Sequence, residues 1–300
     1  MSDSMASLQR KMHSAGELES VVRTMKAMAA LNIGQYERAV SSLDVYYHTV
    51  QLGLAVCFRR GAVLEIESMR RAKAESAGAI VLGSDQGLVG QFNDELVDFA
   101  MQQLRDLAGE KTVWAIGERV QSRLLEQGFA SATLFIVPDS INAITVLVGQ
   151  ILSAIEAWQA ANARMPVYIF HNQPRSGALY EPVSQRLLPL DATWREELLA
   201  LPWPDRNLPE VVGSDAATLS ALIREYLFVS LFRACAESLA SENASRLAAM
   251  QRAEKNIDEL LTGFKRMFYH LRQSGIDEEL FDVIAGFEAL TTLQVRQKGS

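Results

Sequence analysis

The sequence predicts an α/β fold in which two long terminal helices pair as an antiparallel coiled coil and bracket a small, Rossmann-like parallel-sheet domain. Three observations lead to this. Apolar residues recur with an average period of 3.5 at both ends of the chain, short apolar runs alternate with amphipathic segments in the middle, and all eight prolines lie between Pro138 and Pro209. Because proline breaks helix interiors, both ends are free to form long helices.

The N-terminal segment, about residues 5–60, is predicted to form one helix. Alternating steps of four and three from Leu18 meet apolar residues at ten of twelve positions: Leu18, Val22, Met25, Ala29, Asn32, Tyr36, Ala39, Leu43, Tyr46, Val50, Gly53 and Cys57, with Asn32 and Gly53 as the exceptions. A seam of period 3.5 is typical of a helix wound on another helix. At about 1.5 Å per residue the helix would be roughly 80 Å long.

The C-terminal segment, about residues 215–290, shows the same rhythm. Its seam residues are Leu247, Met250, Glu254, Ile257, Leu261, Phe264, Phe268 and Leu271, and after Gly275 the phase restarts at Ile276, Leu280, Val283, Phe287 and Leu290. An exposed apolar seam needs a partner. We expect the two ends to pair with each other. The alternative is two separate coiled coils with other subunits.

The middle of the chain alternates predicted strands and helices, which favours a mostly parallel sheet. The strands are Ala79–Leu82, Val113–Ile116, Thr133–Val137 and Val167–Phe170, and the helices are 94–107, 118–127 and 141–161. The proline-rich residues 172–213 predict an edge strand or two and an irregular return. The predicted domains are therefore residues 1–60 (N-terminal coiled-coil helix), 75–212 (α/β domain) and 213–295 (C-terminal coiled-coil helix).

Net charge, cysteine content and the length of apolar runs limit the possible functions and locations of the chain. The net charge is −7 and the isoelectric point about 5.3, which disfavours a nucleic-acid partner because phosphate binding needs a basic face. Two cysteines form no disulfide framework and indicate a reducing compartment. No apolar run of membrane-spanning length and no signal peptide are expected, so a membrane would be reached only through partners.

The sequence offers little catalytic chemistry. The loop Gly83–Asn93 follows a strand and precedes a helix, where a phosphate loop would lie, but its glycines do not form GxGxxG and no Walker lysine follows. A tight turn with Asn93 or Asp94 as helix cap is the expected structure. The scattered histidines, His13, His48, His171 and His270, predict no metal site. Cys57 and Cys235 look like small buried apolar residues. No catalytic, cofactor-binding or metal residue is predicted.

Three segments resemble the gamma subunit of F-type ATP synthases, in order along nearly the whole chain. They are residues 22–30, the loop 84–93 (Ser-Asp-Gln-Gly-Leu-Val-Gly-Gln-Phe-Asn) and residues 237–250 (Glu-Ser-Leu-Ala-Ser-Glu-Asn-Ala-Ser-Arg-Leu-Ala-Ala-Met), which is very close to the family pattern. Residues 272–280 and 288–290 continue the match. The chain departs from the pattern at Leu31–Ile33, Val89, Tyr269–Leu271 and Asp277, which suggests a divergent bacterial branch and leaves some polar subunit contacts open.

The resemblance implies a non-catalytic rotor without cofactors. The coiled coil would be a central shaft inside a ring of three alpha and three beta subunits, and the α/β domain would lie near the membrane, against the epsilon subunit and the c-subunit ring. Rotation would couple ion flow to ATP synthesis or hydrolysis on beta. The implied location is the cytoplasmic face of the bacterial plasma membrane. The implied shaft contacts are Met25, Arg246, Arg272, Gln273, Phe287 and Leu290.

Alternatives remain open at this point. Arg246 could make an ordinary pair within its helix with Glu242, four residues earlier, and Met25 could serve only in core packing. The whole chain could be a coiled-coil scaffold unrelated to ATP turnover. It could also be a small nucleotide-binding α/β enzyme that uses the Gly83–Asn93 loop.

Overall fold

A computed structural model describes residues 4–61, 76–107, 109–129, 132–162, 165–176, 178–190, 192–205, 207, 209–211 and 214–298, with side chains to Gly286 and without that of Ala178. The chain divides into two compact units, which are described separately. One comprises residues 28–249, and the other comprises residues 1–27 with 250–300.

The sheet lies in the unit of residues 28–249. Its strands are β1 (Ser76–Leu82), β2 (Glu110–Ile116), β3 (Thr133–Phe135), β4 (Val167–Arg175) and β5 (Ala178–Leu188). They lie in the order β3-β2-β1-β4-β5. All neighbouring pairs are parallel except β4 with β5, which forms an antiparallel hairpin at the edge. The predicted mostly parallel sheet is confirmed.

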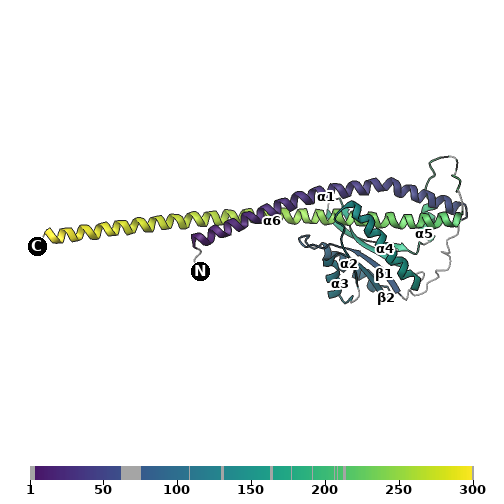
Figure 1. The fold of residues 1–300 in the computed structure, drawn as a ribbon, viewed down its shortest axis with the longest axis horizontal. Coiled ribbons are helices and arrows are strands. Elements are labelled where there is room, and N and C mark those ends of the chain that lie inside the picture. Colours follow the sequence, from purple (N-terminus) through teal and green to yellow (C-terminus); the bar gives the residue numbers. More distant parts are fainter. Residues whose placement is uncertain are drawn as a thin grey trace. The chain divides into compact units, whose positions relative to one another are not determined.

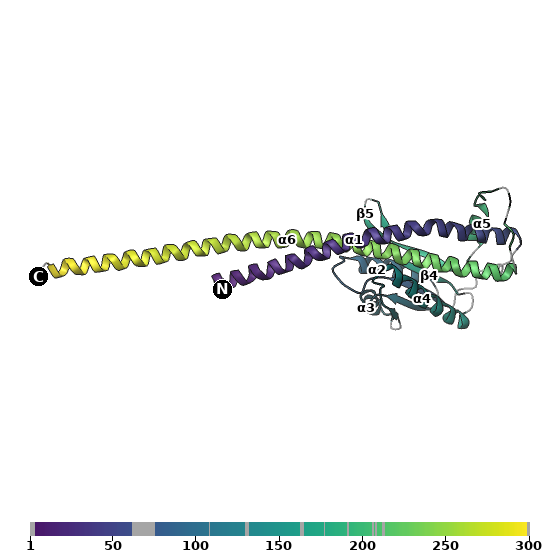
Figure 2. The same cartoon turned by 45° about the horizontal axis from the view of Figure 1, so that its top comes forward.

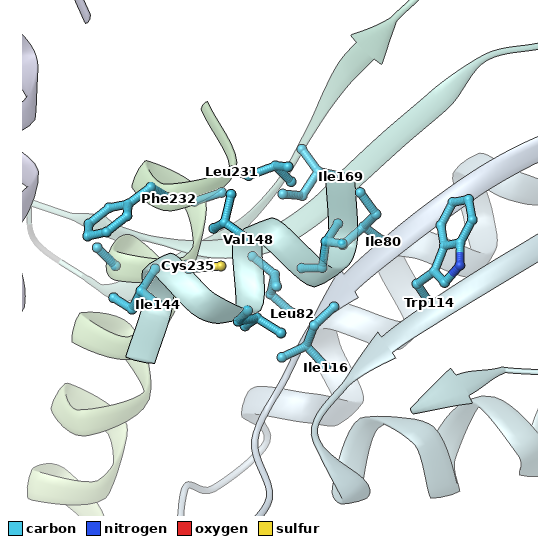
Figure 3. Close-up of a cluster of buried hydrophobic side chains, with 14 of the residues drawn as sticks. Ile80, Leu82, Trp114, Ile116, Ile144, Val148, Ile169, Leu231, Phe232 and Cys235 are labelled. Atoms are coloured by element: carbon cyan, nitrogen blue, oxygen red, sulfur yellow. The ribbon is translucent and has the colours of Figure 1, made fainter. Parts of the chain in front are cut away.

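Helices cover both faces of the sheet (Figure 1). Side chains of β1 alternate between the two faces, as the pleat requires. Ala79 and Val81 pack among residues of α2 (Phe92–Arg105) and α3 (Glu118–Glu126). Ile80 and Leu82 pack among residues of α4 (Ile141–Ala161) and of the C-terminal helix α6 (Asp215–Lys298). Figure 3 shows this second cluster, with Ile80 and Ile169 facing Val148 and Leu231.

The N-terminal helix α1 (Met5–Arg59) runs antiparallel to α6 within this unit, and the two lie side by side in Figures 1 and 2. Three contacts fix the direction, because partners on α6 come earlier as α1 advances: Asn32 with Asn243, Asp44 with Arg233, and Tyr46 with Glu225. The predicted fold class is confirmed. Helix α6 is buried on two sides, since Leu231 packs toward the sheet and Leu219 packs toward α1.

A two-turn helix, α5 (Ala192–Ala200), closes the helix pair at this end and was not predicted. Trp194 packs edge-on against Phe58 of α1 and Tyr226 of α6. The guanidinium of Arg59 donates hydrogen bonds to the carbonyls of Leu199 and Leu201. Helix α5 and Leu201 therefore form a clamp across the two long helices.

In the unit of residues 1–27 and 250–300, the same two helices remain paired and antiparallel. Lys11 lies over the ring of Phe264, and the Lys26 ammonium donates a hydrogen bond to the Glu254 carboxylate. Leu8, Ala15 and Met250 are buried in the seam. The C-terminal part of α6 continues as a helix without α1 beside it (Figures 1 and 2), and the seam residues Ile276, Leu280 and Val283 there are exposed.

Some expectations are wrong in detail. Leu18 and Tyr46 were assigned to the seam, but both are exposed because the contact face is made by neighbouring positions. The expectation of no membrane-length apolar segment is also wrong by length and composition, since α4 meets that test. In the structure six residues of α4, from Ile144 to Ile155, are buried against the sheet.

Candidate functional site

Two of the three segments that resemble the family pattern, residues 84–93 and 237–250, lie near each other. Helix α6 passes the carboxyl end of β1 at this point. The Ser238 hydroxyl of α6 donates a hydrogen bond of 3.1 Å to the carbonyl of Leu82, the last residue of β1. The loop that follows β1 is the predicted turn, residues 83–93. The α6 residues here are polar yet buried: Glu237, Ser238, Ser241, Glu242, Asn243 and Ser245. This face of α6 therefore packs against the rest of the domain and is not exposed to solvent.

The side chain of Asp85, in the loop after β1, accepts hydrogen bonds from two backbone N–H groups elsewhere in the domain. One carboxylate oxygen accepts from the backbone N–H of Glu118 at 2.9 Å, and the other accepts from that of Val137 at 3.0 Å. Glu118 is the first residue of α3, so the carboxylate occupies the position that an anion takes at a helix N-terminus. A phosphate bound there would meet the charge of Asp85. The loop therefore connects the carboxyl ends of β1, β2 and β3 through hydrogen bonds.

The rest of the turn is specified by close contacts. The Asn93 side chain accepts from the Ser84 backbone N–H and donates to the Ser84 hydroxyl. Helix α2 begins at Phe92, so the expected capping role of Asn93 or Asp94 is wrong. Gly117 has a φ of 111°, and a Cβ there would lie 2.6 Å from the Ser84 carbonyl oxygen. Only glycine fits this approach.

Arg246 forms the pair within its own helix that the sequence left open. Its Nη2 lies 2.6 Å from Oε1 of Glu242, and both side chains are largely buried. Burial is the largest influence on Glu242 and raises its pKa above the usual value, while Arg246 acts in the opposite direction. The second carboxylate oxygen and the Arg246 Nε have no hydrogen-bond partner among the described residues. The pair therefore keeps unused hydrogen-bonding capacity.

A charged network missed at the sequence level joins the sheet to both long helices. His171 of β4 contacts Glu237 of α6 at 2.9 Å, and Arg233 holds the other Glu237 oxygen at 2.8 Å. Arg233 also lies 3.2 Å from Asp44 of α1. Burial raises the pKa of Glu237, but His171 and Arg233 outweigh it, so the pKa lies below its usual value. Since Glu237 is ionised, the His171 Nε2–H is the donor.

In the other unit, Met25 is half-buried in the helix seam. The adjacent Lys26 reaches across to Glu254, which Arg23 also approaches. The hydrogen bond from Lys26 is the main reason why the pKa of Glu254 lies below its usual value. Met25 therefore belongs to a seam whose register is marked by a polar contact between α1 and α6.

Further along α6, Arg272 and Gln273 are exposed. Phe287 and Leu290 lie on the helix, but their side chains are outside the described residues. Exposed apolar residues surround this part of α6: Leu271, Ile276, Leu280, Phe281, Val283 and Ile284. Soluble proteins rarely leave so many apolar residues uncovered in one segment. This part of α6 has the character of an interface.

Catalytic machinery does not gather among the residues that the structure describes. No group of three or more His, Cys, Asp or Glu side chains there could hold a metal. Both cysteines are buried as predicted, and burial raises the pKa of Cys235 to about 12. A thiol with so high a pKa is a poor nucleophile at neutral pH.

Comparison with known proteins agrees with the motifs. The profile of the ATP synthase family matches residues 4–290. The ATP synthase gamma chain of Sulfurihydrogenibium sp. (strain YO3AOP1) is 26% identical over 94% of this chain and 97% of that protein. The ATP synthase gamma chain of Nocardioides sp. (strain ATCC BAA-499 / JS614) is also 26% identical, over 98% and 99%.

Solved structures share the fold. A chain in the Euglena gracilis mitochondrial ATP synthase (OSCP/F1/c-ring, rotational state 3) aligns with a TM-score of 0.63 and 15% identity, over 95% of this chain and 94% of that one. A chain in the central stalk/c-ring structure of the Tetrahymena thermophila mitochondrial ATP synthase aligns with a TM-score of 0.54 and 19% identity, over 78% and 99%. The family profile covers nearly the whole sequence and the resemblance to the gamma subunit is confirmed, so this chain belongs to the ATP synthase family.

Proposed function

We propose that this chain is the non-catalytic central-stalk rotor of an F-type ATP synthase. Its rotation couples ion flow through the membrane sector to ATP synthesis or hydrolysis on the beta subunits. The observation that carries this function is the antiparallel pairing of α1 with α6 within each unit, at the clamp of Arg59 in one and at the contact of Lys11 with Phe264 in the other. Two paired helices resist bending and twisting better than one, as a shaft must.

An asymmetric shaft gives three identical catalytic subunits three different environments. A shaft that contacts each subunit differently stabilises a different conformation of each, and rotation exchanges those conformations. The exposed apolar part of α6 fits a sleeve made by the alpha and beta subunits. The sheet domain then lies against the epsilon subunit and the c-subunit ring. Membrane association runs through these partners, at the cytoplasmic face of a bacterial plasma membrane.

The shaft residues have distinct proposed roles. Arg246, whose side chain remains 14% exposed, offers its guanidinium to a carboxylate of a beta subunit. Met25 combines seam packing with a contact to the ring. Arg272 and Gln273 extend from the exposed part of α6 as polar contacts, and Phe287 and Leu290 contribute apolar ones. The departures at Leu31–Ile33 and Tyr269–Leu271 would change which polar contacts form.

The two other functions make different predictions. A nucleotide-binding enzyme would need the Gly83–Asn93 loop to accept phosphate, where Asp85 already holds the backbone N–H groups of Glu118 and Val137. Calorimetric titration of the purified chain with ATP and NAD should show no micromolar binding. A scaffold unrelated to ATP turnover would bind partners without changing their nucleotide hydrolysis.

Co-purification with alpha and beta subunits of the same organism tests the rotor function. The chain alone should hydrolyse no ATP, and the purified complex should hydrolyse it steadily. A chain that fails to join the alpha and beta ring, or that joins it without affecting its ATPase activity, would rule the function out.

A further inference from the structure

Four ionisable side chains form one continuous path through the junction of the sheet with the helix pair. The path runs from His171 on β4 through Glu237 and Arg233 on α6 to Asp44 on α1, with contacts of 2.9, 2.8 and 3.2 Å. Each Glu237 carboxylate oxygen has its own partner. The end at His171 and Glu237 is buried, and the end at Arg233 and Asp44 is open to solvent.

The remaining contacts of this junction are mostly apolar. Leu231, Cys235 and Leu239 of α6 pack in the cluster that includes Ile80 and Ile169 of the sheet (Figure 3). Apolar burial holds surfaces together, but it is not directional and resists sliding or rotation of a helix only through the shape of its side chains. Charge-assisted hydrogen bonds depend on angle and distance, so they oppose such motion directly.

The packing is incomplete beside the network. A cavity of about 260 Å³ is lined by residues of α1, β4, β5 and α6, including Tyr47, Gln173, Ser184 and Glu237. Apolar side chains therefore do not fill this part of the junction. His171, Glu237 and Arg233 line the cavity instead. Loss of that path would remove the directional contacts beside this cavity.

We propose that Glu237 is a positioning residue for the rotor: its two-sided contact fixes the rotational setting of α6 against the sheet and thereby stiffens the transmission of torque from the sheet domain to the shaft. This inference rests on the proposed rotor function. Glu237 touches no nucleotide and acts through His171 and Arg233. The Ser238 hydrogen bond to Leu82, one residue further, holds the same turn of α6 but carries no charge.

The test measures torsional stiffness in the assembled complex. The alpha and beta ring is fixed to a surface, and a probe is attached to the sheet domain through Ser153→Cys, an exposed position on α4. Thermal fluctuations of the probe angle are then recorded while the enzyme is stalled. Glu237→Gln should increase the variance of the angle by roughly twofold, because one directional link of the junction is lost.

A second variant keeps the test independent of folding. His171→Leu removes the link to the sheet but leaves Arg233 to neutralise Glu237, so the chain should assemble. Its variance should rise about as much as that of Glu237→Gln, and the double variant should add little, because both changes break the same link. The control is Glu156→Gln, which breaks an exposed pair between α4 and Arg224 and should leave the variance unchanged.

The outcomes separate this inference from the proposed function. A merely structural role for Glu237 would lower the yield of folded chain but leave the fluctuations of assembled complexes unchanged. If complexes carrying Glu237→Gln or His171→Leu fluctuate like wild type, the positioning role is overturned while the rotor function stands. If the wild-type chain forms no rotating complex, the rotor function itself fails.

Discussion

Two stretches of the same helix, α6, differ in how far their side chains are buried. From Leu231 to Asn243 nearly all side chains are buried, and Glu237 and Ser238 bind fixed partners on the sheet. From Ile276 to Ile284 the apolar side chains are exposed. The first stretch suits permanent attachment, where geometry must not change. The second suits an interface with other chains, because its apolar side chains have no cover within this stretch.

The strongest test of this contrast places a charge in each stretch. Leu231→Asp buries an unpaired carboxylate in the sheet core and should lower the free energy of unfolding by about 4 kcal/mol. Leu280→Asp, with 55% of Leu280 exposed, should change it by less than about 0.5 kcal/mol. Urea unfolding of the isolated chain measures both. Equal losses would show that the distal stretch is buried after all.

The buried network can be tested through pH. Glu237→Gln should cost about 2 kcal/mol at pH 7, because a buried charge-assisted pair is lost. The folded-state pKa of Glu237 is depressed, so its contribution is present above the ordinary glutamate value of 4.5 and is lost as the pH falls through the folded value. The difference between wild type and variant should therefore shrink in acid.

Glu242→Gln is the matched control in the same stretch of α6. Its folded-state pKa is raised, chiefly by burial, so the charged form is disfavoured on folding and a neutral side chain should keep the wild-type stability at pH 7. Unfolding curves from pH 7 to pH 3 distinguish the two glutamates. A pH-independent difference for Glu237→Gln would show that its charge does not matter.

The paired stretch between the two extremes should respond moderately. Leu261→Asp places a carboxylate in the half-buried seam of α6 and should cost about 1–2 kcal/mol. The effect should be local, so amide hydrogen exchange should accelerate in the first turns of α1 more than in the sheet. Unchanged thermal unfolding and unchanged exchange would mean that the seam does not hold the helices together.

A small stability change is expected at Arg246. Arg246→Ala should cost only about 1 kcal/mol, because Glu242 already binds a proton more readily than usual and can neutralise itself. Coupled turnover of the assembled enzyme should fall by a larger factor. A loss of stability without a loss of coupled turnover would make the pair with Glu242 the whole role of Arg246.

Sequence reasoning captured what depends on local pattern. The period of 3.5 located both long helices, because one face of each is buried where the two helices pair. It could not fix their register, so it assigned Leu18 and Tyr46 to the seam, and it treated the apolar repeat from Ile276 as paired although α1 does not extend that far. Helix α5 was missed because two turns between prolines leave too short a periodic signal.

The charged network was missed because its members are far apart in the sequence. His171 and Glu237 are separated by 66 residues, and nothing local marks either as a partner of the other. Asn93 likewise looked like a helix cap, because the tertiary contact with Ser84 that occupies its side chain is invisible in a local window. The positions of the long helices could be predicted because they follow from periodicity. Contacts between residues far apart in the sequence could not be predicted, because they depend on the tertiary fold.

Rotation itself tests the central claim most directly. With the alpha and beta ring fixed to a surface and a probe on Ser153→Cys of the sheet domain, ATP should drive continuous turning of the probe in one direction. The native Cys57 and Cys235 are buried, so the label should attach at the introduced thiol. A probe that stays still while the same complexes hydrolyse ATP would contradict the rotor account.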